Sequence, residues 1–252
     1  MFRVVREKTV TEITAEWDAL ASVRYRQINS GEDISYTQVI VPSLLKLLPK
    51  LTRGKVLDAG CGTGFFTSQL SAQFQHVFGV DPSEKSVEIA KTVAPRATLV
   101  RSTIEEFSSK SEDRFDLIVA NMVLMDVLSL PSFLEGCARL ATARAHLLFS
   151  ITHPWFWPEY YGYANEPWFD YERQIIIESP FRISSEQAGA PISTHVHRSL
   201  SQYVEALKRT GFLISEILEP NPPSNVAEKY KLRWKRPRYL IGAARLVEKA
   251  NP

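Results

Sequence analysis

The 252-residue chain has an ordinary composition, with 44% hydrophobic residues and a formal net charge of +2 at pH 7. A charge this small excludes a global electrostatic demand for nucleic acid or membrane, and the length is ample for one α/β domain. The only two cysteines, Cys61 and Cys137, are too few and too far apart for a disulfide framework or a metal site. We therefore expect no bound metal. Because the N-terminal segment lacks a signal-peptide core and no apolar run approaches a membrane span, we also expect a soluble cytoplasmic protein.

The first 50 residues are expected to form a helical cap. Trp17, Leu20 and Ala21 repeat at helical spacing, and an apolar run over 39–48 predicts a second helix. Between the two, the polar sequence at 29–33 predicts a turn.

Strands and helices then alternate through residues 51–153. Strands are expected over 55–59, 76–81, 98–102, 115–120 and 146–152, and helices over 65–74, 83–93 and 131–142. This alternation predicts a parallel sheet with helices on both faces. In the last segment, 198–252, a helix that begins near Leu200 and stops at Gly211 precedes strands over 212–218 and 239–247.

The alternation is interrupted over 154–197, which is rich in aromatic residues and proline. An insertion of this length is usually functional or disordered, and the aromatic content argues against disorder. Since it follows the carboxyl end of the fifth strand, where open α/β sheets bind ligands, we interpret it as a lid or substrate-recognition insertion. Packing for stability or for dimerisation is the alternative.

The most informative motif is Val-Leu-Asp-Ala-Gly-Cys-Gly-Thr-Gly at residues 56–64. A buried strand ends in Asp58, and Gly60, Gly62 and Gly64 lie in the turn to the next helix, where the missing Cβ atoms let a ligand approach the backbone. The spacing differs from the dinucleotide motif Gly-x-Gly-x-x-Gly and from a phosphate loop. An acid before the turn suits a cationic ligand better than a pyrophosphate.

A second acid follows 23 residues later. The run 77–81 reads as another buried strand that ends in Asp81, whose carboxylate can accept hydrogen bonds from both hydroxyls of a ribose. Pro82 and Ser83 then begin the next helix.

These two acids and the glycine loop resemble the class I S-adenosylmethionine-dependent methyltransferases, most strongly over 50–155. The resemblance implies a Rossmann-like, doubly wound α/β fold with a mostly parallel seven-stranded sheet whose last two strands run antiparallel. It implies S-adenosyl-L-methionine as cofactor and S-adenosyl-L-homocysteine as product. It also implies one methyltransferase domain over 1–252, with a cap (1–50), a cofactor-binding core (51–153), the insertion (154–197) and a C-terminal part (198–252).

The resemblance further implies which residues contact the cofactor. In the family the glycine loop cradles the amino-acid end of the cofactor, the acid after the second strand binds the ribose, and the segment before the first strand closes over the ligand. At 102–103, Ser102 and Thr103 replace the acid that many members use for adenine, so main-chain groups at Thr103 and Ile104 are expected there. The expected cofactor residues are Asp58, Ala59, Gly60, Cys61, Gly62, Gly64, Phe65, Asp81, Pro82, Ser83, Thr103, Ile104, Asn121, Met122, Tyr25 and Arg26.

Two histidines are candidates for catalysis. His153 directly follows the fifth strand and is held extended by Pro154, so we expect it to face the substrate and to accept a proton. His197 begins a His-Arg-x-Leu-Ser-x-Tyr run that is similar to one in many small-molecule methyltransferases. For both residues a wall or packing role is the alternative. Trp155, Tyr160, Tyr161 and Tyr163 are the expected substrate-binding residues.

These observations favour methyl transfer to an O or N atom of a small-molecule acceptor, for example in secondary metabolism, by a monomer or homodimer. One alternative is a tRNA or protein methyltransferase that uses the basic run 229–238, with Tyr230 and Trp234 interleaved. We interpret that run as a solvated loop, so a nucleic acid partner is not expected. The other alternative is a cofactor-binding regulatory protein without turnover.

Overall fold

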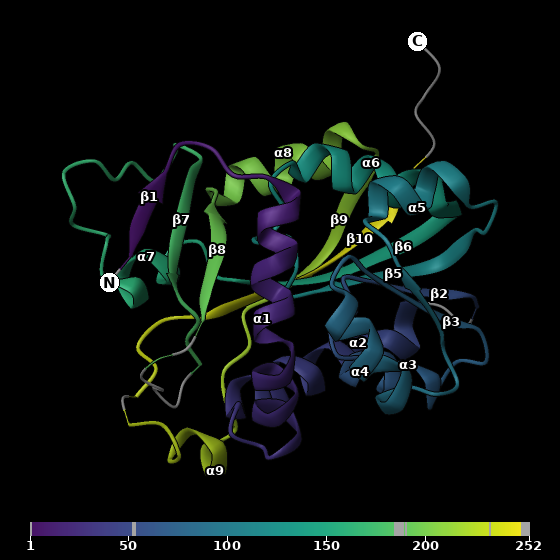
Figure 1. The fold of residues 1–252 in the computed structure, drawn as a ribbon, viewed down its shortest axis with the longest axis horizontal. Helices are drawn as coiled ribbons and strands as arrows, with labels where there is room; N and C mark the ends of the chain where they lie inside the picture. The colour runs from purple at the N-terminus through teal and green to yellow at the C-terminus, as the bar shows by residue number, and fades with distance from the viewer. Residues whose placement is uncertain (1, 52–53, 184–188, 190, 232, 248–252) are drawn as a thin grey trace.

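A seven-stranded, mostly parallel sheet forms the centre of the protein (Figure 1). The computed structural model describes residues 2–51, 54–183, 189, 191–231 and 233–247. The strands lie in the spatial order β4 (Thr98–Arg101), β3 (Val77–Asp81), β2 (Val56–Ala59), β5 (Phe115–Asn121), β6 (Ala141–Thr152), β10 (Tyr239–Leu246) and β9 (Phe212–Leu218). The first five pair in parallel, whereas β10 runs antiparallel to both β6 and β9. The predicted fold class is therefore confirmed.

Parts of the predicted segments lie outside the described residues, namely 52–53 of the core, 184–188 and 190 of the insertion, and 232 and 248–252 of the C-terminal part. Within the described ranges, no helix combines the length and the apolar character that a membrane-spanning helix needs.

Helices cover both faces of the sheet (Figure 1). One face carries α2 (Val41–Leu51), α3 (Phe65–Ser71) and α4 (Glu84–Val93), and the other carries α5 (Ile104–Lys110), α6 (Leu130–Leu140) and α8 (Leu200–Arg209). Because both faces are covered, the inner strands are apolar on both sides, and all four residues of β2 are buried. This is why continuous apolar runs identified these strands correctly.

Helix α5 was not expected from the sequence. The Thr103 hydroxyl caps it by accepting a hydrogen bond from the Glu106 backbone N–H at 3.2 Å, and Glu105 and Glu106 occupy its first turn. With seven residues, the helix is too short to establish an apolar period, so only its capping signal was readable.

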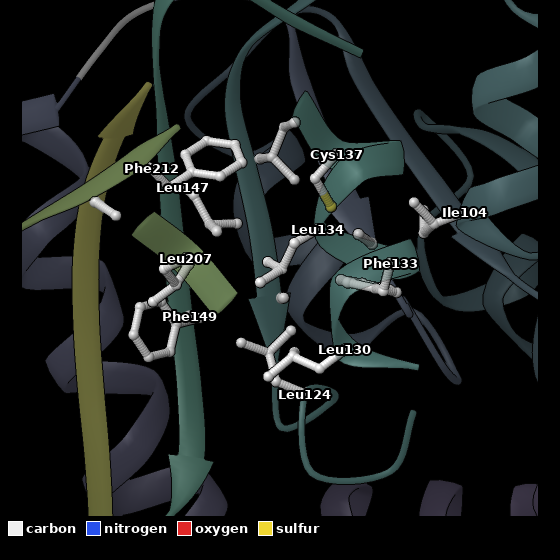
Figure 2. Close-up of a cluster of buried hydrophobic side chains, with 14 of the residues drawn as sticks. Ile104, Leu124, Leu130, Phe133, Leu134, Cys137, Leu147, Phe149, Leu207 and Phe212 are labelled. Carbon is white, nitrogen blue, oxygen red and sulfur yellow. The ribbon is translucent and has the colours of Figure 1, made fainter. Parts of the chain in front are cut away.

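The largest part of the core lies under α6 and α8. Figure 2 shows Leu130, Phe133, Leu134 and Cys137 of α6 facing the sheet, where Leu147 of β6 lies. From the neighbouring elements, Leu207 and Phe212 complete the cluster, and its members are almost fully buried. This packing holds β5 and the loop that follows it against a rigid base.

A second, smaller sheet corrects two predictions. Its antiparallel strands lie in the order β1 (Arg3–Val5), β7 (Ile175–Pro180) and β8 (Ile192–His197), so the N-terminal cap begins with a strand and the insertion contains two. The insertion also forms the short helix α7 (Phe156–Tyr161), and α9 (Ser224–Ala227) lies further along the chain. The isoleucine-rich stretch at 175–177 carried a strand signal that the surrounding aromatic residues obscured.

Helix α1 (Val10–Asn29) stands between the two sheets (Figure 1). Its N-terminus has a capping box, in which Thr9 and Glu12 bond each other's backbone N–H. Glu16 accepts hydrogen bonds from the backbone N–H and hydroxyl of Thr194 in β8, at 2.8 and 3.0 Å. On the other side, Asp18 accepts a hydrogen bond from the Ser83 hydroxyl at 2.6 Å, beside α4. The helix therefore joins the small sheet to the core, and a turn and the π-helix η1 (Tyr36–Ile40) connect it to α2.

The packing under α6 predicts a large cost for truncating Leu134, which has no exposed surface. Leu134→Ala is expected to lower the free energy of unfolding by about 2–5 kcal/mol, because a cavity remains where the side chain packed. Leu213→Ala, on the edge strand β9 where Leu213 is 46% exposed, should change it by only about 0.5 kcal/mol. Urea unfolding of both variants measures the difference. Equal losses would contradict the described core.

Candidate functional site

A cavity of about 260 Å³ opens at the carboxyl ends of the parallel strands, under α1. Its wall comes from the glycine loop after β2, the end of β3, the start of α5, the loop that follows β5, and one face of α1. Of the predicted cofactor residues, the wall includes Gly60, Cys61, Gly62, Phe65, Asp81, Pro82, Thr103, Ile104, Asn121 and Met122. The structure thus brings together ten residues that the sequence distributes over 63 positions.

The glycine loop has a backbone that only glycine adopts readily. Gly60 has φ of 82°, and a Cβ at this position would lie 2.5 Å from Cγ2 of Val123. Gly62 has φ of 51° and would present a Cβ to open space on the cavity side. The loop therefore packs tightly behind Gly60 and presents bare backbone to a ligand at Gly62.

Asp81 connects the tips of two strands. One carboxylate oxygen accepts a hydrogen bond from the backbone N–H of Gly62, and the other accepts one from the backbone N–H of Ser83, both at 2.9 Å. Burial raises the pKa of Asp81 to about 6, although these two hydrogen bonds act in the opposite direction. Each oxygen keeps a lone pair that can accept from a ligand.

Asp58, Ala59, Gly64 and Ser83 were also predicted to contact the cofactor but do not line the cavity. The buried carboxylate of Asp58 accepts a hydrogen bond from the Thr67 hydroxyl at 2.6 Å, and burial raises its pKa to about 7. Ser83 caps α4. These residues lie behind the wall, where they hold the strand-to-helix turns in place.

The start of α5 forms another part of the cavity wall. Ser102, Thr103, Ile104 and Glu105 line it there. Glu105, for which the sequence predicted no role, places a carboxylate near Ser102 and Thr103, which replace the expected acid. Its position in the first turn of a helix carried no sequence signal of a ligand.

A polar network surrounds Asn121 in the wall. The Asn121 amide donates to the Tyr36 hydroxyl at 3.0 Å and accepts from the Ser150 hydroxyl at 2.7 Å. Met122, with φ of 59°, donates its backbone N–H to the same Ser150 hydroxyl at 2.9 Å. Tyr36 was missed by the sequence analysis because it lies in the π-helix, where helical spacing does not predict the exposed face.

Arg24, rather than Tyr25 or Arg26, faces the cavity. The wall residues of α1 are Val10, Ile13, Thr14, Trp17, Ala21, Arg24 and Ile28, which lie on one helical face. Tyr25 is 41% exposed and Arg26 is exposed, because one or two further residues turn a side chain by about 100° or 200° on a helix. The cation of this segment that lines the cavity thus lies two positions before the predicted Arg26.

Neither candidate catalytic histidine lines the cavity. The backbone N–H of Trp155 donates to Nδ1 of His153 at 3.2 Å, so Nε2 carries the proton and donates to Glu219 at 3.0 Å. His197 is buried, and its Nε2 lies 3.0 Å from the carbonyl oxygen of Tyr171. The His153 side chain therefore points toward Glu219, just after β9, instead of lining the cavity.

The four aromatic residues predicted to bind substrate are likewise absent from the cavity wall. Tyr161 and Tyr163 are buried in the core of the small sheet, and Tyr160 donates to the carbonyl oxygen of Ile183 at 3.0 Å. Trp155 is 56% exposed on the surface. The aromatic residues of the insertion stabilise the small sheet, whereas α1 and the loop after β5 supply the wall instead. Among the described residues, no group of three or more potential ligands could hold a metal ion.

Comparison with known proteins identifies the family of the chain. A family model described as a methyltransferase domain matches residues 34–216. A ubiquinone biosynthesis O-methyltransferase from Bradyrhizobium diazoefficiens is 36% identical over 90 residues, which cover 34% of this chain and 35% of that protein. The human mitochondrial protein of the same name is 29% identical over 146 residues, 53% of this chain and 39% of that protein. The chain spans about half the length, or less, of the curated relatives it matches.

Solved structures share the fold at low sequence identity. An S-adenosylmethionine-dependent methyltransferase from Mesorhizobium loti matches with a TM-score of 0.57 and 23% identity, over 81% of this chain and 96% of that chain. A Burkholderia thailandensis 1,6-didemethyltoxoflavin-N1-methyltransferase, solved with bound 1,6-didemethyltoxoflavin and S-adenosylhomocysteine, matches with a TM-score of 0.60 and 17% identity, over 98% of this chain and 95% of that chain. With the family model matched over most of the chain, the protein belongs to the methyltransferase domain family, and its resemblance to the class I S-adenosylmethionine-dependent methyltransferases is confirmed.

Proposed function

We propose that the protein transfers a methyl group from S-adenosylmethionine to an O or N atom of a small-molecule acceptor. The observation that carries the proposal is a single cavity whose wall combines two kinds of residue. One kind is the bare glycine backbone with the carboxylate of Asp81, and the other is the apolar set Trp17, Val127 and Leu128. A polar cofactor and a mostly apolar acceptor would therefore meet within one cavity.

The polar part of the wall, around Asp81 and the glycine loop, fits the cofactor. Asp81 has free lone pairs for the ribose hydroxyls, and the open side of Gly62 accommodates the amino-acid part without a steric clash. Arg24 brings a positive charge to the wall, with its guanidinium 5.8 Å from the centre of the Tyr36 ring. This charge suits the carboxylate of the amino-acid part of the cofactor. Thr103, Ile104 and Glu105 would hold the adenine, with Glu105 as acceptor for its amino group.

The cofactor supplies a methyl group activated by its own sulfonium charge. What remains for this chain is to align the acceptor with that methyl group and to exclude water. Helix α1 does both, because its apolar face covers the cavity while Glu16 and Asp18 fix it to the small sheet and to α4. Anchoring on two sides of the helix favours a defined reaction geometry.

The alternative of an RNA substrate receives less support. Lys229, Lys231 and Arg233 of the basic run are exposed, but none of them lines the cavity. The interleaved Tyr230 is buried, and its hydroxyl bonds with that of Ser35 at 3.0 Å, while Trp234 packs beside it. The aromatic residues that would stack on bases are thus used to attach the run to the N-terminal segment.

A methyl-transfer assay tests the proposed function. Release of S-adenosylhomocysteine would be measured with a panel of phenols, catechols and amines, and in parallel with bulk tRNA and with unfolded protein. We expect turnover with at least one small-molecule class and none with the two polymers. Turnover with a polymer only would support the RNA or protein alternative, and cofactor binding without turnover throughout would support a regulatory protein.

The environment of Asp81 predicts a pH-dependent affinity for S-adenosylhomocysteine. With a pKa of about 6 in the free protein, Asp81 is protonated at pH 5 and has to lose that proton before it accepts from the ribose. The dissociation constant should therefore rise about tenfold between pH 7 and pH 5. In Asp81→Asn the affinity for S-adenosylhomocysteine should be lower, and its dissociation constant should change less between pH 7 and pH 5. Calorimetry at both pH values checks this, and equal slopes in the two proteins would remove the ribose assignment.

The position of His153 predicts a small effect of its replacement. His153→Asn should lower turnover by less than about tenfold, since the loss of a general base costs about 10²–10⁴-fold. The assay uses the acceptor found in the panel and reports kcat and KM separately. A hundredfold loss of kcat with unchanged cofactor affinity would restore His153 as the base.

A further inference from the structure

The loop after β5 presents one carboxylate, Asp126, to the cavity. Asp126 is half-buried in the wall, next to Val127 and Leu128. Within the part of the chain that the structure describes, its carboxylate accepts no hydrogen bond and forms no ion pair. Burial raises the pKa of Asp126 well above its usual range. A carboxyl group in this position is incompletely solvated and favours a ligand that donates to it.

The cations closest to Asp126 are engaged elsewhere. Arg198, at the start of α8, is 2% exposed and donates to the carbonyl oxygens of Leu124, Val127 and Leu128 at 3.1, 2.7 and 2.8 Å. A fourth donor contacts the Gln174 side chain at 3.1 Å. The guanidinium thus fixes the backbone of the loop from behind and acts on Asp126 only through space.

The charged residues of α1 also leave the Asp126 carboxylate without a direct partner. Arg24 donates to Asp33 at 2.9 Å and to Gln27 at 2.8 Å, so it favours the ionised form of Asp126 only at a distance. The negative charge of Glu16 disfavours the ionised form of Asp126. Of the charged wall residues, Arg24, Asp81 and Glu105 are assigned to the proposed cofactor, which leaves Asp126 as the charge beside the apolar wall residues Val127 and Leu128.

We propose that Asp126 binds the amino group of an amine acceptor and accepts its proton, so that this site methylates nitrogen. The inference rests on the proposed function and narrows its substrate class to a primary or secondary amine attached to an apolar group. Trp17, Val127 and Leu128 supply the apolar wall for that group. A bound ammonium compensates the buried carboxylate, whereas a neutral alcohol offers only a weaker, uncharged hydrogen bond.

The reaction is balanced within this site. The ammonium gives one proton to the Asp126 carboxylate, which becomes a carboxylic acid, and the nitrogen regains its lone pair. That lone pair forms the bond to the methyl carbon as the carbon–sulfur bond breaks, and the sulfur keeps the electron pair of the broken bond. The product leaves as a methylated ammonium ion, and Asp126 returns its proton to water.

Matched pairs of amine and alcohol test this assignment by binding alone. Phenethylamine, tryptamine and hexylamine would be titrated calorimetrically into protein saturated with S-adenosylhomocysteine, against 2-phenylethanol, tryptophol and hexanol. We expect at least one amine to bind about 10- to 100-fold more tightly than its alcohol, as for a charged hydrogen bond. Asp126→Asn should remove that preference and leave the affinity for the alcohol and for S-adenosylhomocysteine unchanged.

Two further variants keep the test decisive. Asp126→Glu retains the charge and should retain part of the amine preference, and Glu88→Gln removes an exposed carboxylate of α4 and should change nothing. The proposal is overturned if no amine binds better than its alcohol, if Asp126→Asn keeps the preference, or if Asp126→Asn loses S-adenosylhomocysteine as well. Failure of the wild-type protein to bind S-adenosylhomocysteine would instead refute the proposed function itself.

Discussion

The site depends on one buried carboxylate that connects two strand ends. Asp81 accepts a backbone hydrogen bond from the glycine loop after β2 and another from the turn after β3. Because both donors are main-chain groups, the interaction fixes backbone positions and not merely side chains. The interaction holds the glycine loop next to the carboxyl end of β3, where Gly62 lines the cavity. In the absence of a ligand this arrangement has a cost, since burial raises the pKa of the same carboxyl group to about 6.

The second structural determinant is the attachment of α1. The helix contacts the small sheet through Glu16 and the core through Asp18, and its apolar face closes the cavity between them. Asp18 bonds Ser83, the residue whose backbone N–H also bonds Asp81. The cover of the cavity and the proposed ribose ligand are therefore linked through a single residue. The small sheet, with its aromatic core, holds this helix through the hydrogen bonds between Thr194 and Glu16.

Local signals were sufficient for the proposed cofactor half of the site. The acid, the glycines and the strands around them lie within 26 residues, so their spacing alone predicted the strand-to-helix turn and the position of Asp81. The proposed acceptor half depends on long-range packing, and there the predictions for His153, His197 and the aromatic residues of the insertion were not matched by the cavity wall. Arg198 illustrates the reason, because its contacts with residues 124–128 span 70 to 74 positions and leave no periodic pattern. The phase of α1 was missed for a related reason: only the face that packs decides whether residue 24, 25 or 26 points inward.

The most direct measurement is a calorimetric titration of S-adenosylhomocysteine into the wild-type protein and into Gly60→Val. Since a Cβ at Gly60 would lie 2.5 Å from Val123, the variant distorts the loop that is proposed to hold the ligand, while the sheet behind it remains. We expect saturable binding of one ligand per chain by the wild-type protein and none by the variant, with circular dichroism spectra that show both proteins folded. Equal binding by the two proteins, or no binding by the wild type, would contradict the account.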